Sequence, residues 1–247
     1  MAIVWLYGSF DFIANGAVPD SLRFVSGWRT SPVIIPGRHG VFVGADTRRD
    51  AARFSISGNI YASTATDLRQ IEDDLRQVLS ASANFYIHND RYISVIAESF
   101  AWEIVKVPGL IAAAFSIDVL ATDAVWVSNT LNQSSFSTPG TPTLTNSGSA
   151  PSPPTISITA PVAGLTQVIL SNTTSGDTLT WNGSITSGEV LVIDMEDMSI
   201  AVAGSSDPSG FSSGSAFWSL EPGNNSVSIS STPTAAATVI SWRDRWL

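Results

Sequence analysis

The side chains able to do chemistry in this sequence are few and scattered. Its two histidines, His39 and His88, lie about fifty residues apart and outside any HxxxH or HExxH pattern, so we expect no metal site built on them. Cysteine is absent, which removes thiol nucleophiles, thiolate metal ligands and disulfides. No GxSxG motif marks an activated serine. The sequence therefore predicts no catalytic triad, no metal site and no cofactor.

Carboxylates cluster once in the second half of the chain. Asp194, Glu196 and Asp197 stand in the segment IDMEDMS. Two carboxylates at a defined separation can hydrolyse a glycosidic bond, and a cage of carboxylate oxygens can bind calcium. Adjacent positions on a hairpin point in different directions, so we interpret this segment as a strand end followed by an acidic turn. Glycan hydrolysis by Asp194 and Glu196 remains the least supported alternative.

Eight tryptophans raise the question of sugar binding. Trp181 stands at an expected strand end in the segment WNG, and Trp218 stands inside an expected strand. Aromatic faces on a β-sandwich can stack against pyranose rings, but large aromatic side chains also fill cores. Trp181 and Trp218 are therefore candidate glycan-stacking residues, with core packing as the competing interpretation.

The charge balance argues against general nucleic-acid binding. The formal net charge is −9 and the chain has a single lysine, which leaves little attraction for a phosphate backbone. Arg48, Arg49 and Arg53 form a short basic segment, with Asp46 and Asp50 interleaved. We expect ion pairs here, either solvated or between subunits.

Composition points to a protein that docks or self-assembles. Charged residues make up 13% of the chain and hydrophobic residues 44%, and a surface poor in Lys and Glu resembles an interface. A Ser/Thr-coated β-sandwich is the competing explanation. The first ten residues lack a basic leader, and their apolar run is too short for a membrane span, so we expect a soluble product made inside the cell.

The first part of the chain is predicted to combine short strands with one helix. Residues 53–60 alternate apolar and polar side chains, which is typical of a half-buried strand. From residue 66 to about 80, apolar positions recur at helical spacing after several hydroxyl side chains that can cap a helix. Further strands are expected at residues 3–7, 22–25, 40–43, 84–88, 92–102 and 110–120, the last of them buried on both faces.

The second part is predicted to be all-β. No charged side chain occurs between Asp123 and Asp177, and residues 134–154 are dense in Ser, Thr, Gly and Pro, as at a domain boundary. Turn signals such as Asn182-Gly183 then recur at sandwich spacing, and Gly223-Asn224 is predicted to join strands 217–220 and 225–230 in a hairpin. We expect two domains, residues 1–135 with one helix and residues 136–247 as a β-sandwich. The other strands expected there are 141–145, 155–159, 167–172, 178–181, 189–194, 199–202 and 237–242.

The order and spacing of several segments resemble the distal tail proteins of long-tailed, siphovirus-type bacteriophages. The segments are RFSISGNIYASTATDLRQIEDDLRQVL, HNDRYISV, TLTNSGSAPSPPTISI, WNGSITSGEVLVIDMEDMSIAV, FWSLEPGNNSVSIS and the terminal SWRDRWL. The resemblance covers nearly the full length, and LEPGNNSVSI is its most specific piece. It implies a mainly β fold, with an N-terminal split-barrel-like domain that carries one helix and forms hexameric rings. The C-terminal domain would be a galectin-like β-sandwich.

From this resemblance we expect a structural virion protein of the tail tip that catalyses no reaction. It would form a ring, a homo-hexamer, that joins the tail tube protein to the tail-tip or baseplate machinery and its receptor-binding proteins. Arg48, Arg49 and Arg53 are candidates for lining the lumen of this ring. Strand edges of the N-terminal domain could close the ring by pairing between neighbours. We expect synthesis in the host cytoplasm, no membrane association and no specific nucleic-acid partner. The alternative is a carbohydrate-binding β-sandwich module for host-surface recognition, with Trp181 and Trp218 as its stacking platforms.

Overall fold

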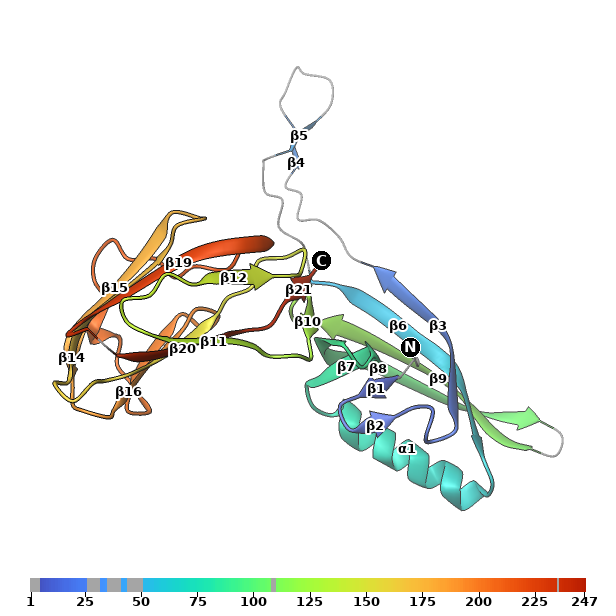
Figure 1. The fold of residues 1–247 in the computed structure, drawn as a ribbon. Coiled ribbons are helices and arrows are strands. Elements are labelled where there is room, and N and C mark those ends of the chain that lie inside the picture. The colour runs from blue at the N-terminus through green and yellow to red at the C-terminus, as the bar shows by residue number, and fades with distance from the viewer. Residues whose placement is uncertain (1–4, 26–31, 35–40, 44–50, 108–109, 235) are drawn as a thin grey trace. The chain divides into compact units, whose positions relative to one another are not determined.

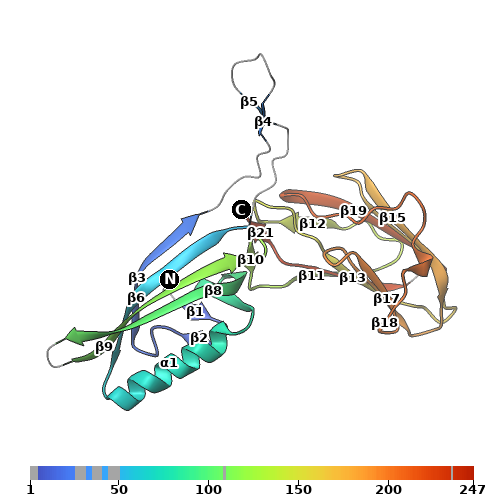
Figure 2. The same cartoon turned by 180° about the vertical axis from the view of Figure 1, so that it is seen from behind.

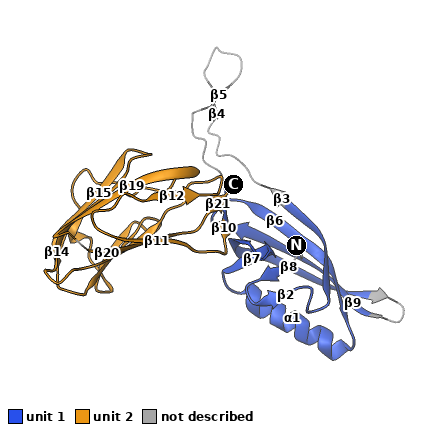
Figure 3. Ribbon diagram, in the orientation of Figure 1, with its two compact units in different colours: residues 1–126 blue, residues 127–247 orange. Residues whose placement is uncertain are grey.

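The computed structural model describes residues 5–25, 32–34, 41–43, 51–107, 110–234 and 236–247. The chain divides into two compact units, Met1–Trp126 and Val127–Leu247 (Figure 3). We refer to them as unit 1 and unit 2. The sequence predicted the domain boundary after residue 135, and the division in the structure lies nine residues earlier, after Trp126. Residues 132–137, which the sequence placed across that boundary, form a strand of unit 2.

Unit 1 is built on one antiparallel sheet with a single helix (Figures 1 and 2). Every neighbouring pair along its main path is antiparallel. A separate two-stranded hairpin consists of β4 (Pro32–Ile34) and β5 (Val41–Val43). The order along the main path is β2 (Phe10–Asp11), β1 (Leu6–Tyr7), β7 (Ala83–His88), β8 (Arg91–Val107), β9 (Leu110–Ala121), β6 (Arg53–Ala62) and β3 (Ala17–Val25).

Helix α1 (Ala65–Leu79) confirms the helix predicted at about 66–80. It begins with a capping box, in which the Thr64 hydroxyl accepts a hydrogen bond from the Asp67 backbone N–H and the Asp67 carboxylate accepts one from the Thr64 N–H. Leu68, Leu75 and Leu79 lie on its buried face. Within the described residues, no helix is long and apolar enough to cross a membrane.

The helix and one face of the sheet together make the core of unit 1. Phe54, Ile56 and Ile60 on β6 are buried and join one apolar cluster with Leu75 of the helix. Because side chains alternate along a strand, the intervening residues of β6 lie on the opposite face. The alternation predicted for residues 53–60 is therefore confirmed. Residues 110–120 differ from the prediction, because Asp118 is exposed and β9 is not buried on both faces.

Unit 2 is a sandwich of two antiparallel sheets, and the expected mainly β fold is confirmed. Its core is one cluster that includes Trp181, Trp218, Leu170 and Ile156. Strand β10 (Trp126–Ser128) begins at the last residue of unit 1, and the remaining short elements of unit 2 are β21 (Arg245–Trp246) and the 3-10 turn η1 (Pro208–Gly210). One sheet has the order β11 (Asn132–Ser137), β20 (Ala237–Trp242), β13 (Thr155–Thr159), β16 (Val190–Asp194), β17 (Ser199–Val202), β18 (Ser205–Ser206), and the other β12 (Thr143–Asn146), β19 (Gly223–Thr232), β14 (Leu165–Asn172), β15 (Asp177–Ile185).

The hairpin predicted for residues 217–230 is wrong. Residues 217–220 form no strand; of these only Leu220 makes an isolated bridge, with Ser152. β19 starts at Gly223, whose φ is +96°, and pairs with β12 and β14 instead. The loop before it is held by the buried Asn225 side chain, which accepts a hydrogen bond from the Glu221 N–H and donates one to the Glu221 carbonyl. The side chain of Asn225, within β19, therefore makes the hydrogen bonds to Glu221 that a hairpin ladder would have supplied.

The Asn182-Gly183 turn signal was also misleading. Both residues lie inside β15, which continues to Ile185 and pairs with β14. Gly183 leaves space for the Trp181 ring, because a Cβ at position 183 would lie 2.3 Å from Cζ2 of Trp181. A glycine within a strand can mark a close approach by another group, and here that group is the indole ring.

Candidate functional site

The face of the unit 1 sheet turned away from the helix is polar and cross-linked by side chains. On β6, Ser55 and Ser57 alternate with buried apolar residues. The Ser57 hydroxyl lies 2.9 Å from the hydroxyl of Ser21 on β3, and the Asn59 amide donates a hydrogen bond of 3.0 Å to the Asp20 carboxylate. Neighbouring strands are thus joined through side chains as well as through the backbone. We call this surface the polar face.

Asp118 of β9 is the centre of the polar face. Its two carboxylate oxygens accept hydrogen bonds from the hydroxyls of Ser55 on β6, at 2.5 Å, and Ser99 on β8, at 2.6 Å. These bonds favour the charged form, the one from Ser55 most, and hold the pKa of Asp118 below its ordinary value. Three adjacent strands are therefore bridged by one exposed carboxylate.

Arg53 also lies beside the polar face, at the start of β6. Its guanidinium donates to the Glu98 carboxylate, with N–O distances of 3.1 and 3.3 Å. The same two side chains, with Arg23 and Asp118, help to line a surface cavity of 360 Å³. Of the arginines predicted to line a lumen or bridge subunits, Arg53 makes its ion pair within the chain, and Arg48 and Arg49 lie outside the described residues.

Two strands of the unit 1 sheet still offer backbone groups at an edge. One is β3, the last strand of the main path, which pairs there only with β6. The other is the second part of β8: β7 pairs with β8 only as far as Val95, so the edge of β8 turned away from β9 continues without β7 from Ile96 to Val107. Such edges bind other strands unless something blocks them.

Both edge strands carry exposed branched aliphatic side chains. Val18 on β3 is 53% exposed and Ile104 on β8 is 74% exposed. The pairing register places Val18 opposite Asn59, Asn59 opposite Ala114, and Ala114 opposite Glu103. Val18 and Ile104 therefore lie at nearly the same level of the sheet, on its opposite edges.

The two tryptophans predicted to stack on sugars are in the core of unit 2. Trp181 is 1% exposed and Trp218 is 3% exposed, and both belong to the central apolar cluster. A buried ring offers no face to a sugar, so the structure favours the competing core-packing interpretation for both. The sequence could not separate the two because a tryptophan in an alternating strand can face either way.

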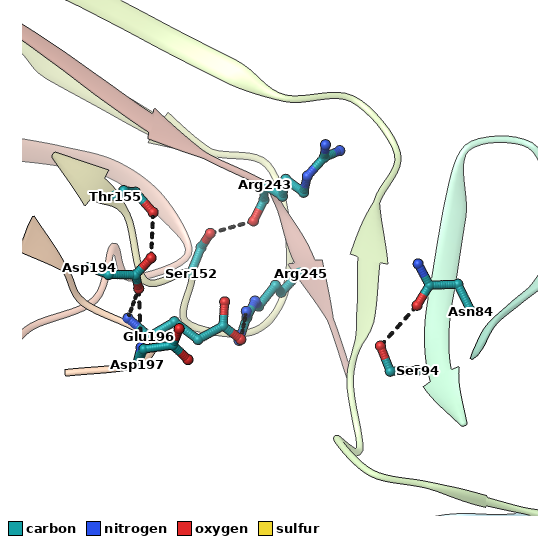
Figure 4. Close-up of polar contacts among 9 residues, drawn as sticks. All are labelled: Asn84, Ser94, Ser152, Thr155, Asp194, Glu196, Asp197, Arg243 and Arg245. Atoms are coloured by element: carbon teal, nitrogen blue, oxygen red, sulfur yellow. Dashed lines mark hydrogen bonds and ion pairs between the residues drawn. The ribbon is translucent and has the colours of Figure 1, made fainter. Parts of the chain in front are cut away.

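The carboxylates of segment 194–197 are engaged in local structure (Figure 4). One oxygen of Asp194 accepts hydrogen bonds from the backbone N–H groups of Glu196 and Asp197, at 2.9 and 3.1 Å, and the other accepts from Thr155. Glu196 forms an ion pair with Arg245. These contacts describe an acidic turn between β16 and β17, as predicted. No group of three or more His, Cys, Asp or Glu able to hold a metal occurs among the described residues.

Sequence reasoning missed the polar contacts that cross strands. Ser99 and Asp118 are nineteen residues apart and Ser55 is further still, so only the register brings them together. The one local signal was the polar alternation of β6. Figure 4 shows a similar pair on the neighbouring hairpin, where the Ser94 hydroxyl donates to Asn84 at 3.1 Å.

Comparison with known proteins gives matches of two kinds. Residues 147–246 match the model of a family described as siphovirus-type tail component, C-terminal domain. Among solved structures, the chain is similar to the Dit protein of phage SPP1, described as a paradigm of the hub adsorption apparatus in phages that infect Gram-positive bacteria. The TM-score is 0.76 at 15% identity, and the alignment covers 100% of both chains. A search of the curated proteins finds no match.

The two matches agree with the division of the chain. The family match lies within unit 2, and the structural likeness runs through both units and shows that the fold is shared. The resemblance to the siphovirus-type distal tail proteins, first seen in short sequence segments, is therefore confirmed. Residues 147–246 are thus similar to the C-terminal domain of siphovirus-type tail components, and the fold of the whole chain is shared with SPP1 Dit.

Proposed function

We propose that this chain is the distal tail hub protein of a siphovirus-type phage. It is a structural component of the virion, and it connects the tail tube to the tail tip or baseplate and to receptor-binding proteins. The observation that carries the proposal is the full-length likeness to SPP1 Dit, in which both units match in the same order. A β-sandwich alone hosts many functions, so the argument needs the two units together.

A ring built from copies of unit 1 is compatible with the strand directions. From β3 to β8 the path crosses β6 and β9, and each of the three steps is antiparallel. The two edge strands therefore run in opposite directions. When copies are related by rotation, β8 of one copy meets β3 of the next as an antiparallel pair, which is a favourable ladder geometry.

The edge side chains are compatible with the same pairing. Val18 lies on the polar face, and Ile104, which follows Glu103, lies on the opposite face. Both are exposed in the single chain, and each would be covered by a different neighbouring side chain where two edges meet. Burying the exposed part of each side chain would contribute about 1 kcal/mol to each junction. The strand edges permit closed rings of more than one size; six copies is the size implied by the resemblance to the distal tail proteins.

The same proposal assigns partners and location. The ring would contact the tail tube protein on one side and tail-tip or baseplate proteins on the other, in the tail of the virion. Unit 2 would act as the adaptor that carries receptor-binding proteins. Its 121 residues, Val127–Leu247, include only ten charged side chains, and a surface with so few charges is suited to protein contacts.

The test is the mass of the full chain in solution, measured by light scattering, with edge variants beside it. We expect a hexamer of the 26.1 kDa chain. Val18→Asp and Ile104→Asp each place a charge on one edge and should shift the protein toward the monomer. Val162→Asp is the matched control, because Val162 is 92% exposed in unit 2 and its variant carries the same added charge.

Two results would count against the proposal. One is a wild-type chain that stays monomeric at every concentration and does not form rings with purified tail tube. The other is a ring that both edge variants leave intact, which would exclude the edges as the ring contact.

A further inference from the structure

A second cavity in unit 1 lies at the turn between β7 and β8. Its volume is 370 Å³, and its lining residues are Ile87, His88, Asp90, Arg91 and Trp126. It shares no residue with the polar face or with the edge positions discussed above. A volume at the lower end of the ~300–1,000 Å³ typical of ligand sites suits a small ligand better than a folded segment of protein. We call it the turn cavity.

A β-bulge shapes the turn cavity. The pairing of β7 with β8 matches Tyr86 with Tyr92 and then shifts, so that His88 pairs with Arg91 and Ile87 is left as the extra residue. Bulges bend a strand and redirect its side chains, and they are frequent beside binding sites. The bulge brings Ile87, His88 and Arg91 to one cavity although successive residues of a regular strand point to opposite faces.

His88 contributes a polar atom whose hydrogen-bonding capacity is unused. Its Nδ1 atom is buried, and no group in the described part of the chain hydrogen-bonds to it. Leaving a buried polar atom unpaired destabilises a fold, and native proteins leave few such atoms. A ligand that brings a hydroxyl group into the turn cavity would satisfy it.

Two lining side chains of the turn cavity carry opposite charges. The Asp90 carboxylate lies 3.6 Å from Nε of Arg91. Together they present hydrogen-bond acceptors and donors side by side, which suits a ligand rich in hydroxyl groups. Trp126 and Ile87 add aromatic and aliphatic surface to the same lining.

We propose that the turn cavity binds one ring of a neutral saccharide. Trp126 would cover the apolar C–H face of the sugar, as amphipathic aromatic side chains do. Asp90 and Arg91 would bind its hydroxyls, and His88 Nδ1 would pair with one further hydroxyl. The inference goes beyond the hub function, and it places glycan binding in unit 1 instead of at the buried Trp181 and Trp218.

The test is titration of the full chain with N-acetylglucosamine and methyl glucoside, observed through ligand NMR signals. We expect saturable binding that Asp90→Asn and Trp126→Ala each weaken about tenfold or more, as loss of a hydrogen bond to a charged group or of an aromatic contact does. Glu103→Gln is the matched control, since it removes one exposed carboxylate on β8 outside the turn cavity and should leave binding unchanged.

Three outcomes would overturn the inference. The first is absence of saturable binding by either sugar. The second is binding that Asp90→Asn, the variant with the smallest change of shape, leaves intact. The third is sodium acetate competing as well as the sugars, which would make the turn cavity an anion site. None of them bears on ring formation, because the mass of the assembly is measured separately.

Discussion

Replacing Gly183 by alanine tests how tightly the core of unit 2 is packed around Trp181. The new Cβ would lie 2.3 Å from Cζ2 and 2.6 Å from Cη2 of the buried indole. Contacts this short do not persist, so the ring or strand β15 must move. Gly183 is not among the residues with positive φ, which means that its backbone conformation accepts alanine and the effect is purely steric.

The magnitude follows from known costs of overpacking. Adding a methyl group to a close-packed core costs about 1–3 kcal/mol. Trp181→Phe removes the benzo portion of the indole, where both clashing atoms lie, and in the described structure no group hydrogen-bonds to the buried Nε1 that is lost with it. We therefore expect the double variant to be about 1–2 kcal/mol more stable than the sum of the single effects predicts.

Hydrogen exchange of the full chain, followed by mass spectrometry, measures this locally. Peptides from β14 and β15 report on the stability of unit 2, and peptides from β6 serve as an internal reference. Gly176→Ala is the control: Gly176 has φ +86° and nothing within 4 Å of an added Cβ, so its cost is conformational and should not couple to Trp181→Phe. Strict additivity of Gly183→Ala and Trp181→Phe would refute the argument that the glycine exists to accommodate the indole.

Three further predictions concern single residues. Thr64→Ala removes the hydroxyl that accepts from the Asp67 N–H at 3.1 Å and should cost about 1 kcal/mol in urea unfolding; a change below the error would mean that the cap is not used. Ser99→Ala should raise the pKa of Asp118 toward its ordinary value in a carboxyl ¹³C titration. Because the pKa of Asp118 is lowered in the folded wild type, the ionised carboxylate stabilises the fold above its ordinary pKa, and this stability is lost as the pH falls through the lowered pKa. The Ser99→Ala variant should therefore lose less stability on acidification than the wild type. An unshifted Asp118 titration would contradict this. Asn225→Ala removes the buried side chain that holds Glu221 through bonds of 2.9 and 2.7 Å and should cost about 2 kcal/mol, with faster exchange at the start of β19 as the check and unchanged exchange as the contrary result.

Local periodicity was enough to predict many elements of this fold. The helix predicted at 66–80 is Ala65–Leu79, and the strands predicted at 155–159, 199–202 and 237–242 have those bounds in the structure. In these segments apolar and polar residues alternate with the period of the element itself, so the face that the tertiary structure buries is already the apolar face of the sequence.

Elements that depend on distant partners were not predicted in the same way. Residues 217–220 have the alternating pattern of a strand. Strand β19, their predicted partner, pairs with β12 and β14 instead, so residues 217–220 do not pair with it. Residues 132–137 have the polar composition of a linker, yet they pair along their whole length with β20 and become a strand. Pairing across the chain decides such cases, because backbone hydrogen bonds do not depend on side-chain type.

The sequence by itself determined a mainly β protein with one helix, through local periodicity, and an acidic, lysine-poor composition. The order and spacing of its segments also carried the resemblance to distal tail proteins. The tertiary structure alone decided that Trp181 and Trp218 are core residues, that Asp118 joins three strands, and that His88 and Trp126 line one cavity. The reason is that the direction of a side chain depends on strand register, and register is set by contacts between residues that are far apart in the chain.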